Sequence, residues 1–212
     1  MEKVIGFQLF KIQILQYSES TTKLEISTNY ISWKPKVKII KNRLFDNLQI
    51  CLRKNGDYIF YRCGAENLHS VIEINLNSLP EHYTEYFFES ILKELPESFI
   101  VAEFDGKIIG YVMCKIEFGF SNFRKLGFVK KGHIVSIAIL EQHRGRKIGT
   151  ILMEEAINGL VSRRTEEVYL EVRVSNTAAI KMYEKLNFKM RSRLKTYYRD
   201  GEDAFLMALE LS

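Results

Sequence analysis

Cysteine and long apolar runs are both scarce in this sequence of 212 residues. The three cysteines, Cys51, Cys63 and Cys114, lie far apart and form no C-x-x-C pair, so we expect neither a disulfide framework nor a metal site. No stretch approaches the ~20 consecutive apolar residues that a helix needs to cross a bilayer. The first apolar run, residues 4–17, is broken by polar side chains and lacks the small-residue cleavage site of a signal peptide. These absences favour a cytoplasmic protein with no membrane contact.

A strong charge imbalance is also lacking, except in the first quarter of the chain. Residues 1–56 hold ten of the 31 lysines and arginines but only four of the 26 acidic residues, which leaves 21 cations against 22 anions in residues 57–212. Short alternating segments, residues 10–14 and 36–40, predict a small β-rich extension over residues 1–56. Its basic run, residues 34–43, is compatible with a contact to RNA or the ribosome; the alternative is a charged strand that protects a sheet edge.

Residues 57–212 alternate between strand and helix patterns, which predicts an α/β (α+β) domain with a strongly twisted mixed sheet and helices on both faces. Helical apolar spacing stops at Pro80 and again at Pro96. The Asp105-Gly106 pair predicts a hairpin, and so does the Asp-Gly pair in residues 199–203. The expected helices are residues 66–79, 83–95, a segment from residue 148 onward, and 177–186; the expected strands are residues 58–63, those flanking the two Asp-Gly pairs, 133–140 and 167–174.

A basic, glycine-containing turn precedes the third expected helix. Gly145 allows close backbone approach, and Arg144, Arg146 and Lys147 add positive charge next to the unpaired N–H groups of the helix N-terminus. The preceding strand is apolar on both faces, so the turn leaves the carboxyl end of an interior strand, where open α/β sheets bind ligands. The turn therefore predicts an anion site, and a solvated basic face is the alternative.

Four segments carry a resemblance to a known family. They are LPEHY at residues 79–83, VSIAILEQHRGRKIGTILM at 135–153, YLEVRVSNTAAIKMYEKLNF at 169–188 and YYRDGEDAFLM at 197–207. Together they resemble the GNAT acetyltransferases and, within them, the catalytic subunit of the N-terminal acetyltransferase A type. The resemblance covers about residues 57–212 and implies the GNAT fold, with acetyl-coenzyme A as co-substrate.

The resemblance also implies which residues hold the coenzyme. The family loop, [Q/R]-x-x-G-x-[G/A], maps onto residues 144–149, with Lys147 in place of the central glycine. Backbone N–H groups from Arg144 to Thr150 are expected to bind the pyrophosphate, and Asn176 the pantetheine arm; a helix cap is the other role open to Asn176. The full expected set is Ile137, Ala138, Ile139, Arg144, Gly145, Arg146, Lys147, Ile148, Gly149, Thr150, Asn176 and Tyr183.

Four residues are catalytic candidates. By resemblance, His133 and Glu171 hold a water near the attacking amine, and Tyr183 supplies a proton or a hydrogen bond to the leaving thiolate. A strand-end histidine, an exposed carboxylate paired with Arg173 and a packed core tyrosine are the respective alternatives. Glu81 is implied to lie beside the substrate amine as a base or specificity determinant, with a solvated loop charge as the alternative.

The polypeptide substrate is expected to contact the LPEHY loop and the paired tyrosines. The candidate residues are Leu79, Pro80, Glu81, Tyr83, Tyr197 and Tyr198, where ordinary packing is the alternative for the two last. The function that the resemblance implies is acetylation of polypeptide N-termini, including nascent chains at the ribosome. Two alternatives stay open: a GNAT enzyme that acts on a ribosomal protein, lysine or small amine, and a ribosome- or nucleic-acid-binding module without activity. The sequence leaves the oligomeric state open.

Overall fold

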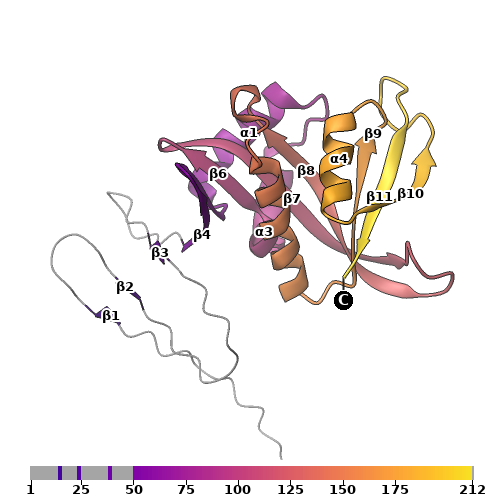
Figure 1. Ribbon diagram of the computed structural model, residues 1–212, viewed down its shortest axis with the longest axis horizontal. Helices are drawn as coiled ribbons and strands as arrows, with labels where there is room; N and C mark the ends of the chain where they lie inside the picture. Colours follow the sequence, from indigo (N-terminus) through magenta and orange to yellow (C-terminus); the bar gives the residue numbers. More distant parts are fainter. Residues whose placement is uncertain (1–13, 16–22, 25–37, 40–49, 212) are drawn as a thin grey trace, which may run out of the picture. The chain divides into compact units, whose positions relative to one another are not determined.

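The computed structural model describes residues 14–15, 23–24, 38–39 and 50–211 (Figure 1). The chain divides into two units, Met1–Leu52 and Arg53–Ser212. In the first, β1 (Ile14–Leu15) pairs with β2 (Lys23–Leu24), and β3 (Lys38–Ile39) pairs with the start of β4 (Ile50–Asn55). Most of the two predicted strands, residues 10–14 and 36–40, and of the basic run, residues 34–43, lies outside the described residues.

The second unit alternates strands and helices as predicted, and the predicted fold class is confirmed. Its elements after β4 are β5 (Tyr58–Arg62), η1 (Ala65–Asn67), α1 (Leu68–Ser78), α2 (Glu85–Glu94), η2 (Pro96–Ser98), β6 (Ile100–Phe104), β7 (Lys107–Phe120), β8 (Phe128–Ile139), η3 (Glu141–His143), α3 (Ile148–Ser162), β9 (Glu167–Arg173), α4 (Thr177–Lys185), β10 (Lys189–Leu194) and β11 (Ala204–Glu210). From β5 onward the sheet order is β5-β6-β7-β8-β9-β11-β10, and only the β8–β9 pair is parallel. The sheet is therefore mixed, with β7 and β8 at its centre.

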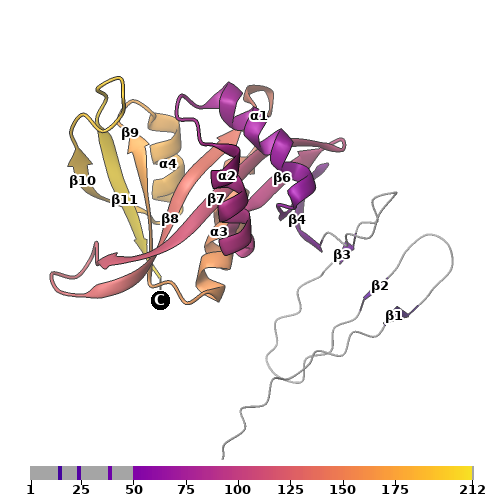
Figure 2. The ribbon, with the colours of Figure 1, turned by 180° about the vertical axis from the view of Figure 1, so that it is seen from behind.

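Local sequence signals set the helix ends. Thr84 caps α2 by accepting a hydrogen bond from the N–H of Phe87 at 3.3 Å, and Pro96 follows one residue after Leu95, the C-cap. Helices α1 and α2 cover one face of the sheet, and α3 and α4 cover the other (Figures 1 and 2). Among the residues that the structure describes, no helix combines the length and apolar character needed to span a membrane.

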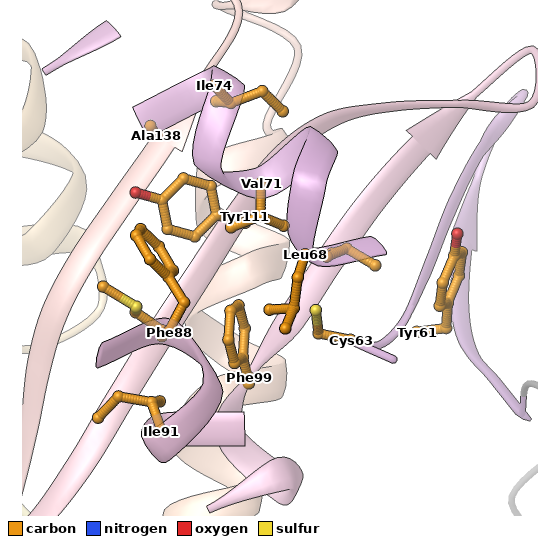
Figure 3. Close-up of a cluster of buried hydrophobic side chains, with 12 residues drawn as sticks. Tyr61, Cys63, Leu68, Val71, Ile74, Phe88, Ile91, Phe99, Tyr111 and Ala138 are labelled. Atoms are coloured by element: carbon orange, nitrogen blue, oxygen red, sulfur yellow. The ribbon is translucent and has the colours of Figure 1, made fainter. Parts of the chain in front are cut away.

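A hydrophobic cluster fills the space between the sheet and the α1–α2 pair (Figure 3). Phe88 from α2, Phe99 and Val101 surround Tyr111 of β7, and all four are inaccessible to solvent. Tyr111 meets Phe88 at a centroid distance of 6.3 Å and Phe99 at 6.4 Å. Burial of such rings supplies most of the free energy that holds the two helices on the sheet.

The β7–β8 hairpin is longer than the sequence pattern predicts. The apolar pattern indicates strand ends near residues 116 and 133, whereas β7 and β8 pair from Gly110–Ile139 out to Phe120–Phe128. The hairpin loop is fixed by Glu167, a fully buried carboxylate that accepts hydrogen bonds from the backbone N–H and the side-chain amide of Asn122 at 2.8 and 3.1 Å. This long-range contact leaves no signal in the local sequence.

Candidate active site

The parallel strands β8 and β9 pair over only part of their length. Their register runs from Lys131–Glu167 to His133–Tyr169, although β8 continues to Ile139 and β9 to Arg173. Beyond His133 the edge of β8 that faces β9 therefore offers backbone N–H and C=O groups that a ligand can pair with. The predicted contact residues Ile137, Ala138 and Ile139 lie on this edge.

A β-bulge lies at the point where the two strands separate. In the β7–β8 register Met113 is opposite Ser136 and Cys114 is opposite Ile134, so Val135 is the extra residue. Bulges redirect backbone and side-chain groups and are frequent next to active sites. The hydroxyl of Tyr83 donates to the carbonyl oxygen of Val135 at 3.3 Å, which brings the LPEHY loop to the bulge.

His133 and Glu171 form a close pair across the separating strands. His133 Nε2 lies 2.7 Å from Glu171 Oε2, and the two side chains are only 16% and 13% exposed. Because a carboxylate only accepts hydrogen bonds, Nε2 carries the proton, and in the neutral imidazole the lone pair is on Nδ1. That Nδ1 atom is buried and has no hydrogen-bond partner among the residues that the structure describes. The alternative pairing of Glu171 with Arg173 is wrong, because Arg173 binds other carboxylates.

The imidazole of His133 is oriented by stacking. The ring of Tyr169 lies parallel to it, with centroids 4.5 Å apart and planes 2° from parallel. Tyr169 donates its hydroxyl hydrogen to Glu117, and Lys131 Nζ lies 4.5 Å from the centre of the Tyr169 ring. The imidazole of His133 is thus held on one side by the Glu171 carboxylate and on another by the ring of Tyr169, which is itself fixed.

Arg173 gathers three carboxylates next to this pair. It contacts Glu81 at 2.7 Å, Asp200 at 2.6 Å and Glu202 at 2.8 Å. Its guanidinium group also lies over the ring of Tyr198, 3.9 Å from the centroid. Glu81 is therefore not a solvated loop charge: Arg173 fixes the LPEHY loop to the turn between β10 and β11.

The predicted substrate residues converge on the same region. Tyr197 contacts Tyr198 edge-on at 5.1 Å. Burial raises the pKa of Tyr197 to about 12, and the neighbouring Glu171 and Tyr83 contribute to the rise. Leu79 and Tyr83 pack against the core cluster, whereas Pro80 is exposed. The carbonyl oxygen of Leu79 also accepts a hydrogen bond from His82 Nε2 at 2.8 Å, which closes the loop.

The turn that the sequence predicts to bind an anion, residues 144–147, leads directly into α3. Gly145 has φ 75° and Lys147 has φ 63°, so both lie in the left-handed region. No side chain caps the N-terminus of α3, so its first N–H groups, from Ile148 to Thr150, point outward with no intrahelical partner. The two arginines are bound to the protein itself: Arg144 Nε donates to Ile139 O at 3.1 Å, and Arg146 donates to the hydroxyl of Tyr58 at 3.1 Å. Gly149 provides the space for α3 to start close to α4, because a Cβ there would lie 2.9 Å from Met182 Sδ.

Lys147 occupies the left-handed position that the family pattern assigns to glycine, which gives a testable prediction. A non-glycine residue in this conformation costs about 1 kcal/mol, and a β-branched residue costs more. We expect Lys147→Gly to leave folding stability equal or up to about 1 kcal/mol higher, and Lys147→Val to lower it by about 1–2 kcal/mol. Thermal melts with and without coenzyme measure both. Since the two variants lose the same charge, equal stability of the two would contradict the strain at this position.

Asn176 and Tyr183 lie on α4, beside the start of α3. Asn176 caps α4, since its side-chain oxygen accepts a hydrogen bond from the N–H of Ala179 at 3.2 Å. Tyr183 is buried, packs against Phe188 with ring centroids 5.9 Å apart, and has a pKa raised by burial. The cap and packing alternatives are thus present in the structure, and coenzyme contact stays a prediction for both residues.

The buried tyrosines predict how stability depends on pH. Burial raises the pKa of Tyr111 to about 12, partly offset by hydrogen bonds from Ser136 and Asn75, and burial also raises the pKa of Tyr183. The folded state therefore keeps these protons to a higher pH than the unfolded state. Stability is unaffected below pH ~10 and falls above it, by about 1.4 kcal/mol per pH unit for each fully buried tyrosine. Melting temperatures between pH 8 and 11.5 test this, and a flat profile above pH 10 would contradict it.

The sequence did not reveal the roles of two residues of the site, Arg173 and Tyr169. Arg173 entered only as a partner for Glu171, and Tyr169 was not considered. The sequence held a signal for both, because Tyr169 and Arg173 lie two residues before and two residues after Glu171. Side chains at such alternate positions of a strand share one face of the sheet. Among the described residues, no group of three or more His, Cys, Asp or Glu side chains is arranged to hold a metal ion.

Comparisons with known proteins identify the family of this chain. Residues 68–188 match the Acetyltransferase (GNAT) family. An N-alpha-acetyltransferase of Sulfurisphaera tokodaii is 48% identical over 161 residues, which covers 75% of this chain and 96% of the relative. The solved structure of the NatC complex bound to Gag peptide and CoA includes a chain with a TM-score of 0.66 and 26% identity, covering 74% of this chain and 99% of that one. Ard1 from Thermoplasma volcanium has a TM-score of 0.63 and 26% identity, covering 74% and 99%.

The family match covers more than half of the chain. This protein belongs to the GNAT family and is an acetyltransferase, as the sequence resemblance implied.

Proposed function

We propose that this chain is a protein Nα-acetyltransferase, which transfers the acetyl group of acetyl-coenzyme A to the free α-amino group of a polypeptide. The observation that carries the proposal is the His133–Glu171 pair, with its unpartnered Nδ1, at the point where β8 separates from β9. The names of the archaeal relative and of the solved NatC and Ard1 structures support the same activity.

The base only has to be mild. An α-amino group has a pKa of about 7.7–8.0, against about 10.4 for lysine, so a substantial neutral fraction exists near pH 7.5. His133 accepts the proton of the amine at Nδ1, directly or through one water, and Glu171 stabilises the imidazolium by accepting its Nε2 hydrogen bond. The amine nitrogen forms its bond to the thioester carbon in a direct attack.

Other residues complete the transfer. Backbone N–H groups of β8 after the bulge, near Ile137 and Ala138, are suited to donate to the developing oxyanion. As the carbon–sulfur bond breaks, the thiolate leaves with a hydrogen bond donated by Tyr183, whose raised pKa keeps the phenol protonated at every assay pH. The N–H groups from Arg144 to Thr150 bind the pyrophosphate, and Asn176 binds the pantetheine arm.

The peptide enters between the LPEHY loop and the two tyrosines. In this proposal Glu81 accepts hydrogen bonds from the substrate ammonium or from the hydroxyl of a first-residue serine or threonine. Tyr197 and Tyr198 line the peptide backbone on the opposite side. We further propose that the enzyme works in the cytoplasm on nascent chains at the ribosome and that the basic extension contributes an RNA contact.

A peptide panel tests the proposal. Wild-type protein and acetyl-coenzyme A are incubated with peptides that begin with Ser, Ala, Thr, Met-Leu or Met-Glu, and with an N-terminally blocked peptide that offers only lysine. Peptides with a free N-terminus are expected to be acetylated at least tenfold faster than the blocked lysine peptide, because of the lower pKa of the α-amino group. Transfer to lysine alone would establish the nearby enzyme alternative instead. Binding of acetyl-coenzyme A without transfer to any peptide would contradict the proposal.

A further inference from the structure

Three polar side chains form a continuous hydrogen-bonded chain through the apolar core. Ser136 Oγ lies 2.7 Å from the hydroxyl of Tyr111, and Asn75 Nδ2 donates to that hydroxyl at 3.0 Å. Asn75 and Tyr111 are fully buried, and Ser136 is 7% exposed. Figure 3 shows Tyr111 among the apolar side chains of the cluster, with its hydroxyl pointing toward the end where Ala138 lies.

The hydrogen bonds among Asn75, Tyr111 and Ser136 connect the bulge of β8 to the LPEHY loop. Ser136 follows Val135, the bulged residue, and Asn75 Nδ2 also donates to the backbone carbonyl oxygen of Glu81 at 3.3 Å. The Tyr83–Val135 hydrogen bond makes a second connection between the same two elements. The loop is thus held relative to the edge of β8 at two points, the backbone carbonyl of Glu81 and the side chain of Tyr83.

Folding stability alone does not account for these hydrogen-bonded side chains. Asn75 Oδ1 is buried and has no hydrogen-bond partner in the described part of the protein, although a buried unpaired acceptor costs folding free energy. An apolar residue at position 75 would avoid that cost but would leave the Glu81 carbonyl oxygen without its donor. These hydrogen bonds instead set a defined distance between the LPEHY loop and β8.

We propose that Tyr111 and Asn75 are positioning residues for catalysis, which hold the Glu81 loop in register with β8. Neither touches substrate or coenzyme; they act through Glu81. Tyr111→Phe removes only the hydroxyl and keeps the ring in the core. The inference deepens the proposed function, because it concerns the placement of the peptide's amino terminus.

The experiment compares two buried tyrosines. Tyr61 is also buried and donates its hydroxyl hydrogen to Glu103 at 2.6 Å, so Tyr61→Phe is a matched control with the same chemical change. We expect Tyr111→Phe to lower kcat/KM for the best N-terminal peptide about tenfold, with the Kd for acetyl-coenzyme A within twofold of wild type. We expect Tyr61→Phe to keep kcat/KM within twofold, and hydrogen exchange of residues 79–84 to rise in Tyr111→Phe alone.

A double variant separates positioning from general destabilisation. In a Glu81→Gln background, Tyr111→Phe should lower kcat/KM less than threefold, because the residue it positions is already changed. An undiminished tenfold loss in that background, or equal losses in Tyr61→Phe, would overturn the inference. If Tyr111→Phe does not fold, Ser136→Ala interrupts the chain at its other end and carries the same expectations. Wild-type protein that acetylates no peptide would refute the proposed function, whereas an active wild type with an unaffected Tyr111→Phe refutes only this inference.

Discussion

Replacing His133 with alanine is expected to lower kcat/KM for N-terminal peptides by about 10²–10³-fold and to leave acetyl-coenzyme A binding within a factor of about three. General base catalysis by a positioned side chain contributes rates of this order. His133 Nδ1 lies where β8 and β9 separate, buried and without a partner among the described residues. The turn predicted to bind the coenzyme, residues 144–150 and called the coenzyme turn below, lies at the other end of β8, beyond Ile139. Steady-state kinetics with varied peptide, and calorimetry with acetyl-coenzyme A, measure the two quantities.

A matched control comes from a second histidine. His69 lies on α1 with its side chain 86% exposed, so His69→Ala makes the same substitution away from the site and should leave kcat/KM unchanged. In Glu171→Gln, kcat/KM should fall by about tenfold or more. In the double variant His133→Ala with Glu171→Gln, kcat/KM should fall no further than in His133→Ala alone, because the carboxylate acts through the imidazole. Full activity in His133→Ala at pH 7 would exclude His133 as the base.

The sequence was sufficient for the fold class because local signals recur along residues 57–212. Pro80 and Pro96 end helices, Asp105-Gly106 forms a hairpin turn, and apolar periodicity distinguishes strands from helices. The buried strand 133–140 was correctly predicted as interior. The far end of the β7–β8 hairpin was missed, because its large apolar side chains, Phe118, Phe120 and Phe128, are exposed and its loop is fixed by the distant Glu167.

The candidate site was predictable as a set of residues but not as a geometry. His133 and Glu171 were expected on neighbouring strands, where both hold one water, but their direct side-chain contact at 2.7 Å is seen only in the structure. Arg173 was considered only as an alternative partner for Glu171, since residues two apart on a strand share a face, and its contacts with Glu81, Asp200 and Glu202 were not foreseen. The Asn75–Tyr111 contact joins residues 36 positions apart, and no composition or spacing rule predicts a polar residue inside an apolar core.

Gly159→Ala is expected to destabilise the protein by about 3 kcal/mol or more, the largest effect on stability that we predict for a one-atom side chain. Helix α3 passes so close to η2 at this point that a Cβ on residue 159 would lie 2.1 Å from the carbonyl oxygen of Glu97 and 2.4 Å from Ser98 Oγ. The backbone oxygen cannot rotate away, so α3 or the segment before β6 has to move. Ser98 Oγ also donates to the carbonyl oxygen of Ala156 at 3.0 Å, a bond that such a movement breaks.

The neighbouring residue provides the control for this prediction. Asn158 is exposed on the same turn of α3, so Asn158→Ala creates the same residue without the contact and should be neutral or slightly stabilising, because alanine favours helix. A loss of 3 kcal/mol lowers the melting temperature by roughly 6–12 °C in a domain of this size. Because α3 begins at the coenzyme turn, its displacement should also weaken coenzyme binding, so added acetyl-coenzyme A should raise the melting temperature less in Gly159→Ala than in Asn158→Ala. Equal melting temperatures of the two variants would show that α3 does not pass η2 at the distance described.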